Sequence, residues 1–209
     1  MNRFVIGVDF DNTIVTYDKL LHDVAVQRGL IPPDTGKNKT SIRDHIRRLP
    51  DGDIQWQILQ GIVYGPRLGE AALNDGVMPF FESCRRKAIS TYIVSHKTEL
   101  SPYDETGTNL RKAAISWMTA RGFFRPDGPG LTEENVYFCS DRKEKIERIV
   151  QLGCTHFIDD LEEVFLEKEF PGGVEKILYA PNRSGCELAG VRIARNWQEV
   201  CDYFFNAGN

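Results

Sequence analysis

Two aspartates close the first apolar segment of the chain. Asp9 and Asp11 follow residues 4–8, a short apolar run rich in β-branched residues that predicts a buried strand. Two carboxylates at this spacing repel each other unless a cation or a proton lies between them, so the pair predicts a metal site or an acid–base pair with separated pKa values. The alternative is a strand followed by a turn in which Asn12 and Thr13 bond their own backbone.

Polar side chains also follow two later apolar segments. Ser95 comes directly after the predicted strand 91–94, and Asp159 and Asp160 come directly after the predicted strand 155–158. In open α/β sheets the carboxyl ends of parallel strands lie at one edge, which is where ligands bind. We therefore expect these side chains to converge with the first two aspartates at that edge. By itself, a serine after a strand is as well explained by a plain turn.

The elements that must position these groups are a sheet and the helices that cover it. From residue 76 onward, apolar segments typical of strands alternate with amphipathic segments typical of helices. The predicted strands are 91–94, 136–139, 155–158, 176–179 and 191–194, and the predicted helices are 79–88, 109–120, 143–152 and 197–205. This alternation predicts an α/β fold with a Rossmann-like parallel sheet covered by helices on both faces.

Residues 15–75 interrupt this pattern. They contain three helical segments and loops rich in helix breakers, and we predict no strand among them. We interpret this segment as a small all-helical cap inserted into a core formed by residues 1–14 and 76–209. A lid is a natural use for such an insertion.

Composition and charge narrow the class of protein. The chain has 209 residues, enough for one domain with an insertion, and its 41% hydrophobic and 27% charged residues are typical of a globular protein. The net charge of −4 argues against a general nucleic-acid binder, and no apolar stretch approaches the length of a membrane-spanning helix. Five cysteines without a CxxC pair indicate neither a disulfide framework nor a thiolate zinc site. We therefore expect a cytoplasmic protein without nucleic-acid or membrane partners, and the sequence is silent on its oligomeric state.

The order of four short motifs resembles one protein family. The motifs are, in chain order, DFDNT at residues 9–13, VSH at residues 94–96, a lysine in the helix 143–152, and FIDD at residues 157–160. This order is similar to that of the haloacid dehalogenase (HAD) superfamily of phosphatases and phosphotransferases, many of which carry a helical cap after the first motif. The resemblance covers residues 4–14 and 76–205.

The resemblance implies phosphoryl transfer through a covalent intermediate. Asp9 would be the nucleophile that forms an aspartyl-phosphate, which splits one displacement into two. Asp11 would protonate the leaving alcohol and then activate water for the second displacement. An acid at this second position favours phosphate esters, because the halide that a dehalogenase releases needs no proton.

The resemblance also implies a bound Mg²⁺ ion. The Asp9 carboxylate, the Asp11 backbone carbonyl and Asp159 would bind it, with water and a phosphate oxygen completing an octahedron. Asp160 and Glu163 would bind water molecules of the cation. The alternative for Asp159 and Asp160 is that they cap the helix that follows them.

Ser95 and a lysine complete the implied site. Ser95 would donate its hydroxyl to a phosphoryl oxygen, and one lysine would hold the nucleophile and the phosphate together as a point charge. Lys143 and Lys145 both lie in the first turn of their helix and are both candidates. We favour Lys145, because it shares a helix face with Ile149 and Leu152 and so lies near the side packed against the sheet.

Further residues are predicted to contact the substrate. They are Asn12, Thr13, His96, Lys97, Arg43 and Arg47. The two arginines belong to a basic cluster in the insertion that would hold an anionic substrate. Charged residues on a helix face are, alternatively, only solvated.

The leading prediction is a magnesium-dependent phosphomonoester hydrolase that acts on a small phosphorylated metabolite, such as a sugar phosphate or a nucleotide. A phosphotransferase or phosphomutase of the same fold is the first alternative. The second is a non-catalytic signalling module that accepts phosphate on an aspartate. The large insertion after the first strand, and the lysine that precedes the last acidic pair, both argue against such a module.

Overall fold

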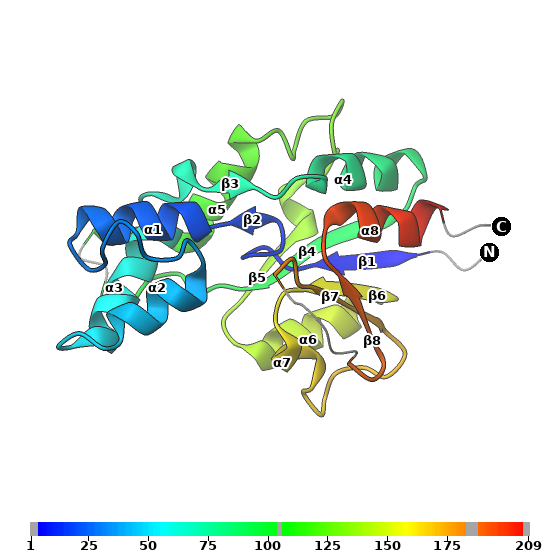
Figure 1. Cartoon of the computed structure of the whole chain (residues 1–209). Helices are drawn as coiled ribbons and strands as arrows, with labels where there is room; N and C mark the ends of the chain where they lie inside the picture. The colour runs from blue at the N-terminus through cyan, green and yellow to red at the C-terminus, as the bar shows by residue number, and fades with distance from the viewer. Residues whose placement is uncertain (1–3, 104–105, 183–187, 207–209) are drawn as a thin grey trace. The chain divides into compact units, whose positions relative to one another are not determined.

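The structure is a computed structural model that describes residues 4–103, 106–182 and 188–206 (Figure 1). The chain divides into two compact units. One, here called the α/β unit, comprises Met1–Ile14, Leu73–Lys97 and Gly122–Asn209. The other, here called the helical unit, comprises Val15–Ala72 and Thr98–Arg121.

A six-stranded sheet forms the centre of the α/β unit. Its strands are β1 (Val5–Val8), β4 (Ser90–His96), β5 (Val136–Cys139), β6 (His156–Asp159), β7 (Glu175–Tyr179) and β8 (Val191–Ala194). They lie in the order β5-β4-β1-β6-β7-β8, and each neighbouring pair is parallel. The chain builds outward from β1 first on one side and then on the other, so the strand order reverses between β1 and β6. Ligands of open α/β sheets bind at such a reversal.

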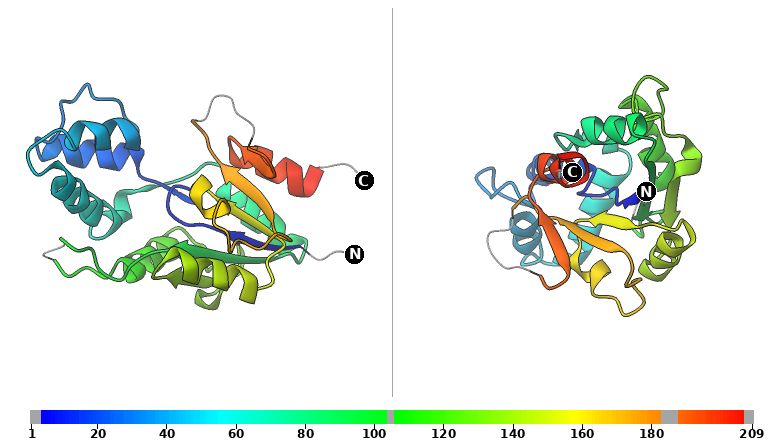
Figure 2. Two further views of the ribbon diagram at one scale, coloured as in Figure 1. Left: turned by 90° about the horizontal axis from the view of Figure 1, so that it is seen from below. Right: turned by 90° about the vertical axis from the view of Figure 1, so that its right-hand side faces the viewer.

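Helices cover both faces of this sheet, as predicted (Figures 1 and 2). They are α4 (Val77–Arg86), α6 (Arg142–Gln151), α7 (Glu162–Phe165), α8 (Trp197–Cys201), the π-helix η3 (Asp202–Asn206) and the 3-10 helix η2 (Glu133–Asn135). Helices α4 and α8 lie on one face, where the Phe80 and Trp197 rings are 5.0 Å apart. Helices α6 and α7 lie on the other, where Ile149 and Phe165 pack in one buried cluster with Phe157 of β6. The predicted α/β architecture is therefore confirmed.

Gly7 of β1 has no room for a side chain. A Cβ atom at this position would lie 2.5 Å from Cδ2 of Phe157, whose ring is fully buried. We expect Gly7→Ala to lower the free energy of unfolding by about 1–3 kcal/mol, because an added methyl group in a packed core displaces its neighbours. Gly172→Ala is the control, since nothing lies within 4 Å of its Cβ position. Urea denaturation compares the two variants, and equal stabilities would contradict this account of β1.

The helical unit contains four α-helices and one turn of 3-10 helix. These are α1 (Asp18–Gln27), α2 (Lys39–Ile46), α3 (Gly52–Tyr64), α5 (Leu110–Ala120) and η1 (Leu68–Glu70). Two strands of two residues each, β2 (Val15–Thr16) and β3 (Ala72–Leu73), pair with each other. We predicted no strand in the insertion, because two residues are too few to show an alternating pattern.

Helix α5 belongs to the helical unit, whereas its place in the sequence predicted that it would belong to the α/β portion. Its buried residues include Leu110, Ala114 and Trp117. The Trp117 indole Nε1 donates a 3.1 Å hydrogen bond to the carbonyl oxygen of Ala71, and the Arg121 guanidinium donates to the same oxygen at 2.7 Å. Helical periodicity identifies the apolar face of α5 but not the neighbour that covers it, which is why sequence order misplaced this segment.

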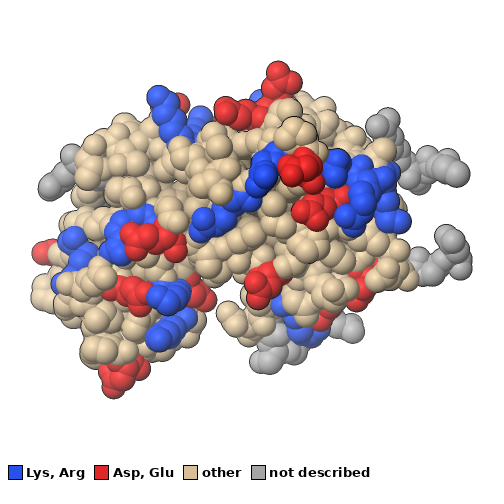
Figure 3. Space-filling view, turned by 90° about the horizontal axis from the view of Figure 1, so that it is seen from above, with Lys and Arg blue, Asp and Glu red and all other residues tan. Residues whose placement is uncertain are grey.

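Charges of both signs are mixed on one face of the protein. On the face shown in Figure 3, basic and acidic side chains lie beside one another. Among the described residues, no helix has both the length and the apolar character needed to cross a membrane.

Candidate active site

The first strand places Asp9 at the carboxyl edge of the sheet. The backbone N–H of Asp9 donates a 2.8 Å hydrogen bond to the carbonyl oxygen of Ile158 in β6, and the residue is only 4% exposed. A tight turn follows, in which the N–H of Ile14 donates to the Phe10 carbonyl at 3.0 Å. Asn12 has a φ of 60°, a left-handed conformation that asparagine tolerates better than most residues. A tight turn is therefore present directly beyond the buried carboxylate, and the backbone bond closes it, whereas the Thr13 hydroxyl makes no hydrogen bond to a described residue.

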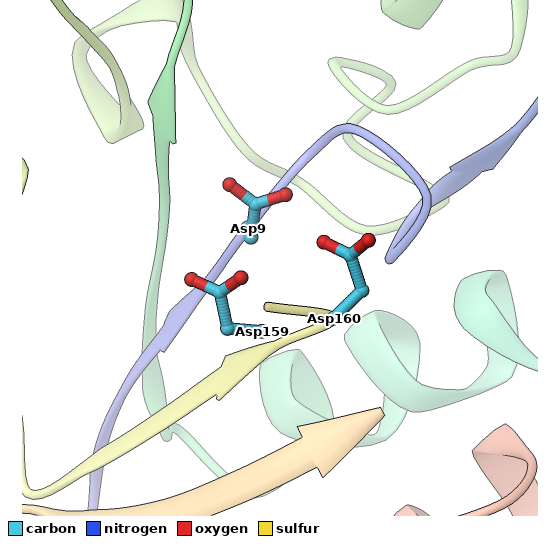
Figure 4. Close-up of side chains that lie close together, drawn as sticks. All are labelled: Asp9, Asp159 and Asp160. Carbon is cyan, nitrogen blue, oxygen red and sulfur yellow. The ribbon is translucent and has the colours of Figure 1, made fainter. Parts of the chain in front are cut away.

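Three aspartates gather at this edge (Figure 4). Carboxylate oxygens of Asp9, Asp159 and Asp160 lie within 4.8 Å of one another, close enough to hold a metal ion together. Asp159 ends β6 and is fully buried, and its Oδ1 accepts a 3.0 Å hydrogen bond from the N–H of Leu161. Helix α7 has no side-chain cap among the described residues, so Asp159 does not have the alternative capping role, and its Oδ2 accepts a hydrogen bond from Lys145.

Helix α6 contributes a buried lysine to the same group. Lys145 is 2% exposed, and its Nζ donates hydrogen bonds of 2.6 Å to Asp9 Oδ1 and 2.7 Å to Asp159 Oδ2. Asp141 caps the helix by accepting a 2.8 Å bond from the N–H of Glu144, which fixes where its first turn begins. The Lys143 side chain is 81% exposed. Of the two candidate lysines, the structure places Lys145 at the site.

Burial and neighbouring charges act against each other in this cluster. The pKa of Asp9 is raised to about 7, mainly by burial and in addition by the Asp159 and Asp11 carboxylates, while the Lys145 ammonium acts to lower it. Burial by itself would lower the pKa of Lys145, but the Asp159 and Asp9 carboxylates outweigh burial and raise it. Lys145 is therefore charged at neutral pH, and its ammonium only partly offsets the effect of burial on the pKa of Asp9.

The raised pKa of Asp9 predicts how the stability of the metal-free protein depends on pH. Between 3.8, its ordinary pKa, and about 7, folded Asp9 keeps a proton that the unfolded chain has released. Raising the pH through this window therefore lowers the free energy of unfolding. In EDTA, wild-type protein should lose stability relative to Asp9→Asn from about pH 4 to pH 7, as measured by urea denaturation. The prediction would be contradicted if the free energies of unfolding of the two proteins changed in parallel over this pH range.

Asp11 lies outside the group of three aspartates and has a lysine of its own. The Nζ of Lys97 lies 3.0 Å from Asp11 Oδ1 and 2.9 Å from Asp11 Oδ2. The Lys97 side chain is 2% exposed and that of Asp11 is 20% exposed. Lys97, predicted as a substrate contact, is thus bound to the predicted acid–base residue.

Two buried hydroxyl groups lie in the predicted motifs. Ser95 is 1% exposed and Thr13 is fully buried, and neither hydroxyl has a hydrogen-bond partner among the residues that the structure describes. Ser95 lies in β4 two residues beyond Ile93, which pairs with Val8 of β1, so it is close to the carboxyl end of that strand. Buried hydroxyls are normally bonded, so these two require an explanation, such as a catalytic role or a water molecule or ion bound there.

Two residues that the sequence analysis did not identify hold the loop after β1. The indole Nε1 of Trp197 donates a 3.1 Å hydrogen bond to the Thr13 carbonyl oxygen, and the Asn74 side-chain amide donates to the same oxygen at 2.9 Å. Neither residue lies in a motif, and no pattern in the sequence indicates these contacts, which join distant parts of the chain.

The remaining predicted residues have their own partners or are exposed. His96 is exposed, and its Nε2 lies 3.1 Å from the Ser140 carbonyl oxygen. Glu163 is exposed on α7 and does not belong to the group of acidic side chains that could hold a metal ion together. Within the helical unit, Arg43 pairs with Asp44 at 2.8 Å and Arg47 with Asp53 at 2.8 Å.

No protein-family model matches the sequence, and no curated protein matches it. Solved structures do resemble it over its full length. A HAD-family hydrolase from Deinococcus radiodurans, with bound phosphate and sodium, is 14% identical, with a TM-score of 0.59 over 100% of this chain and 98% of that one. A HAD-superfamily hydrolase from Ehrlichia chaffeensis is 14% identical, with a TM-score of 0.56 over 100% of both chains.

A third similar structure is a HAD hydrolase from Bacillus subtilis bound to magnesium. It is 13% identical, with a TM-score of 0.50 over 98% of this chain and 100% of that one. Identities this low carry information about the fold alone. The chain therefore has the fold of the HAD-superfamily hydrolases.

Proposed function

We propose that this protein is a magnesium-dependent phosphatase of the HAD superfamily, which hydrolyses a small phosphorylated metabolite through an aspartyl-phosphate on Asp9. The observation that carries the proposal is the buried ammonium of Lys145, bonded to both Asp9 and Asp159. These two carboxylates come from β1 and β6, on either side of the reversal in strand order. A sugar phosphate or a nucleotide is the class of substrate that we expect.

The residues of the cluster fit a magnesium ion. Mg²⁺ prefers oxygen ligands, and the group of three aspartates offers carboxylate oxygens within 4.8 Å of one another. Burial is the main reason that the pKa of Asp9 is raised, and Lys145 only partly offsets it, so a further positive charge would favour the ionised carboxylate. Asp9, Asp159 and the Asp11 carbonyl would hold the cation, with Asp160 and Glu163 on its water molecules. When bound, it would neutralise charge on the phosphoryl oxygens.

The first displacement forms the aspartyl-phosphate. An oxygen of Asp9 bonds to phosphorus while the bond from phosphorus to the leaving alcohol breaks. The electron pair of that bond goes to the alcohol oxygen, which takes the proton of Asp11. The Ser95 hydroxyl would donate to a phosphoryl oxygen, and Lys145 holds Asp9 in place for the attack.

The second displacement regenerates the enzyme. Asp11, now without its proton, takes one from a water molecule as the water oxygen bonds to phosphorus. The bond from phosphorus to Asp9 breaks and its electron pair returns to the carboxylate. Inorganic phosphate leaves, and Asp11 again carries the proton that the next cycle needs.

We assign the insertion 15–75 the role of a cap, and we add α5 to it, which leaves the rest of residues 1–14 and 76–209 as the catalytic core. Its arginines Arg43 and Arg47, together with Asn12, Thr13 and His96, are proposed substrate contacts. Both arginines already pair with acidic neighbours, so an anionic substrate has to compete with those pairs.

The proposal is tested with a panel of sugar phosphates and nucleotides, assayed for released phosphate with Mg²⁺ and with EDTA. We expect turnover of at least one ester with Mg²⁺, its loss in EDTA, and its return when Mg²⁺ is added in excess. Mg²⁺ should also raise the melting temperature, because it binds the folded protein and not the unfolded chain. Phosphate found on a second alcohol would identify a phosphotransferase instead. Turnover that EDTA leaves unchanged would contradict the proposed site.

A further inference from the structure

Lys97 forms a buried ion pair with Asp11. Its ammonium group contacts both oxygens of Asp11, at 3.0 Å and 2.9 Å. A carboxylate bound through both oxygens cannot rotate about its terminal bond without breaking a contact. We propose that Lys97 is a positioning residue that orients Asp11 for proton transfer to the leaving group. This inference rests on the proposed function.

The lysine itself is held at both ends. Its backbone N–H donates a 2.9 Å hydrogen bond to the Cys139 carbonyl oxygen, which extends the pairing of β4 with β5 by one residue. Its Nζ lies 5.6 Å from the centre of the Phe10 ring, and that ring packs edge to face on Phe138 at 6.4 Å. A buried side chain fixed in this way has little freedom to follow a substrate.

The two lysines of the site therefore have different partners. Lys145 bonds to the proposed nucleophile Asp9, and Lys97 bonds to the proposed acid Asp11. If Lys97 bound the substrate phosphate directly, its removal would weaken the binding of every ester to the same extent. A lysine that acts through Asp11 matters only where the leaving group needs a proton, and this difference can be measured.

The test uses substituted phenyl phosphates, whose shapes are similar and whose leaving groups differ in their need for a proton, together with the best alkyl ester of the panel. The quantity compared is kcat/KM, because it reports only the steps up to formation of the aspartyl-phosphate. We expect Lys97→Met to lower kcat/KM for alkyl phosphates by about 10–100-fold, and for p-nitrophenyl phosphate by less than about threefold. Lys143→Met, a change of an exposed lysine, is the matched control and should leave both values unchanged.

A double variant distinguishes a lysine that orients Asp11 from one that binds the substrate phosphate, even if Lys97→Met alone does not fold. Asp11→Asn with Lys97→Met removes both charges of the pair and leaves no buried charge uncompensated. We expect its kcat/KM to equal that of Asp11→Asn for every ester, since Lys97 then has no carboxylate to orient. A further loss in the double variant, or an equal loss for all esters in Lys97→Met, would overturn the inference. If the wild-type protein hydrolyses none of the esters, the proposed function fails instead.

Discussion

Asp9→Asn should abolish phosphatase activity, lowering kcat by at least about 10⁴-fold. An amide oxygen is a far weaker nucleophile than a carboxylate, so no covalent intermediate can form on this residue. The variant should still fold, because the backbone N–H of Asp9 keeps its bond to Ile158 and the neutral amide is less costly to bury than a carboxylate. Its melting temperature in EDTA should therefore be no lower than that of the wild-type protein.

Acid quenching during turnover measures the intermediate directly. With phosphate-labelled substrate, the wild-type protein should retain label that hydroxylamine releases, as an acyl phosphate requires, and Asp9→Asn should retain none. Asp127→Asn is the matched control, because Asp127 is an exposed residue whose side chain is 77% accessible. Its kcat should equal that of the wild-type protein. Label on Asp9→Asn, or turnover by it at a rate near that of the wild type, would contradict Asp9 as the nucleophile.

Local patterns in the sequence were enough to predict which side chains lie at the sheet edge. Asp9 and Asp159 end apolar segments, and parallel strands bring such ends together. Lys145 was chosen over Lys143 because residues four apart lie on one face of a helix, and only Lys145 is four residues from Ile149. The positions of these side chains could be predicted because the backbone geometry of one element determines the direction in which each of them points.

Contacts between distant elements could not be predicted in this way. The bond from Trp197 to the Thr13 carbonyl joins residues 184 positions apart, and the pair of Lys97 with Asp11 joins residues 86 positions apart. Helix α5 shows the same limit, since its apolar face could equally have packed on the sheet. Periodicity indicates that a face is buried, but the partner that buries it is a property of the tertiary structure.

Lys145→Met should be the most destabilising single change at the site. The substitution keeps the length of the side chain but leaves Asp9 and Asp159 as neighbouring buried carboxylates without their ammonium partner. Removing one partner of a buried ion pair costs about 3–5 kcal/mol. In a protein of this size, that corresponds to a melting temperature lower by about 6–20 °C. The loss should be smaller at pH 6 than at pH 8, because a proton on Asp9 removes part of the repulsion.

Adding Mg²⁺ tests whether the loss of stability in Lys145→Met comes from uncompensated negative charge. Mg²⁺ places positive charge beside the same carboxylates, so at about 100 times its dissociation constant it should return about 2.7 kcal/mol to a folded variant that still binds it. Lys143→Met changes the same residue type two positions earlier, where the side chain is 81% exposed, and should alter stability by less than about 0.5 kcal/mol. Differential scanning fluorimetry of both variants, in EDTA and in Mg²⁺, measures these shifts. Similar melting temperatures for the two variants would mean that Lys145 does not hold the carboxylates together, and the charge balance on which the metal site is argued would fail with it.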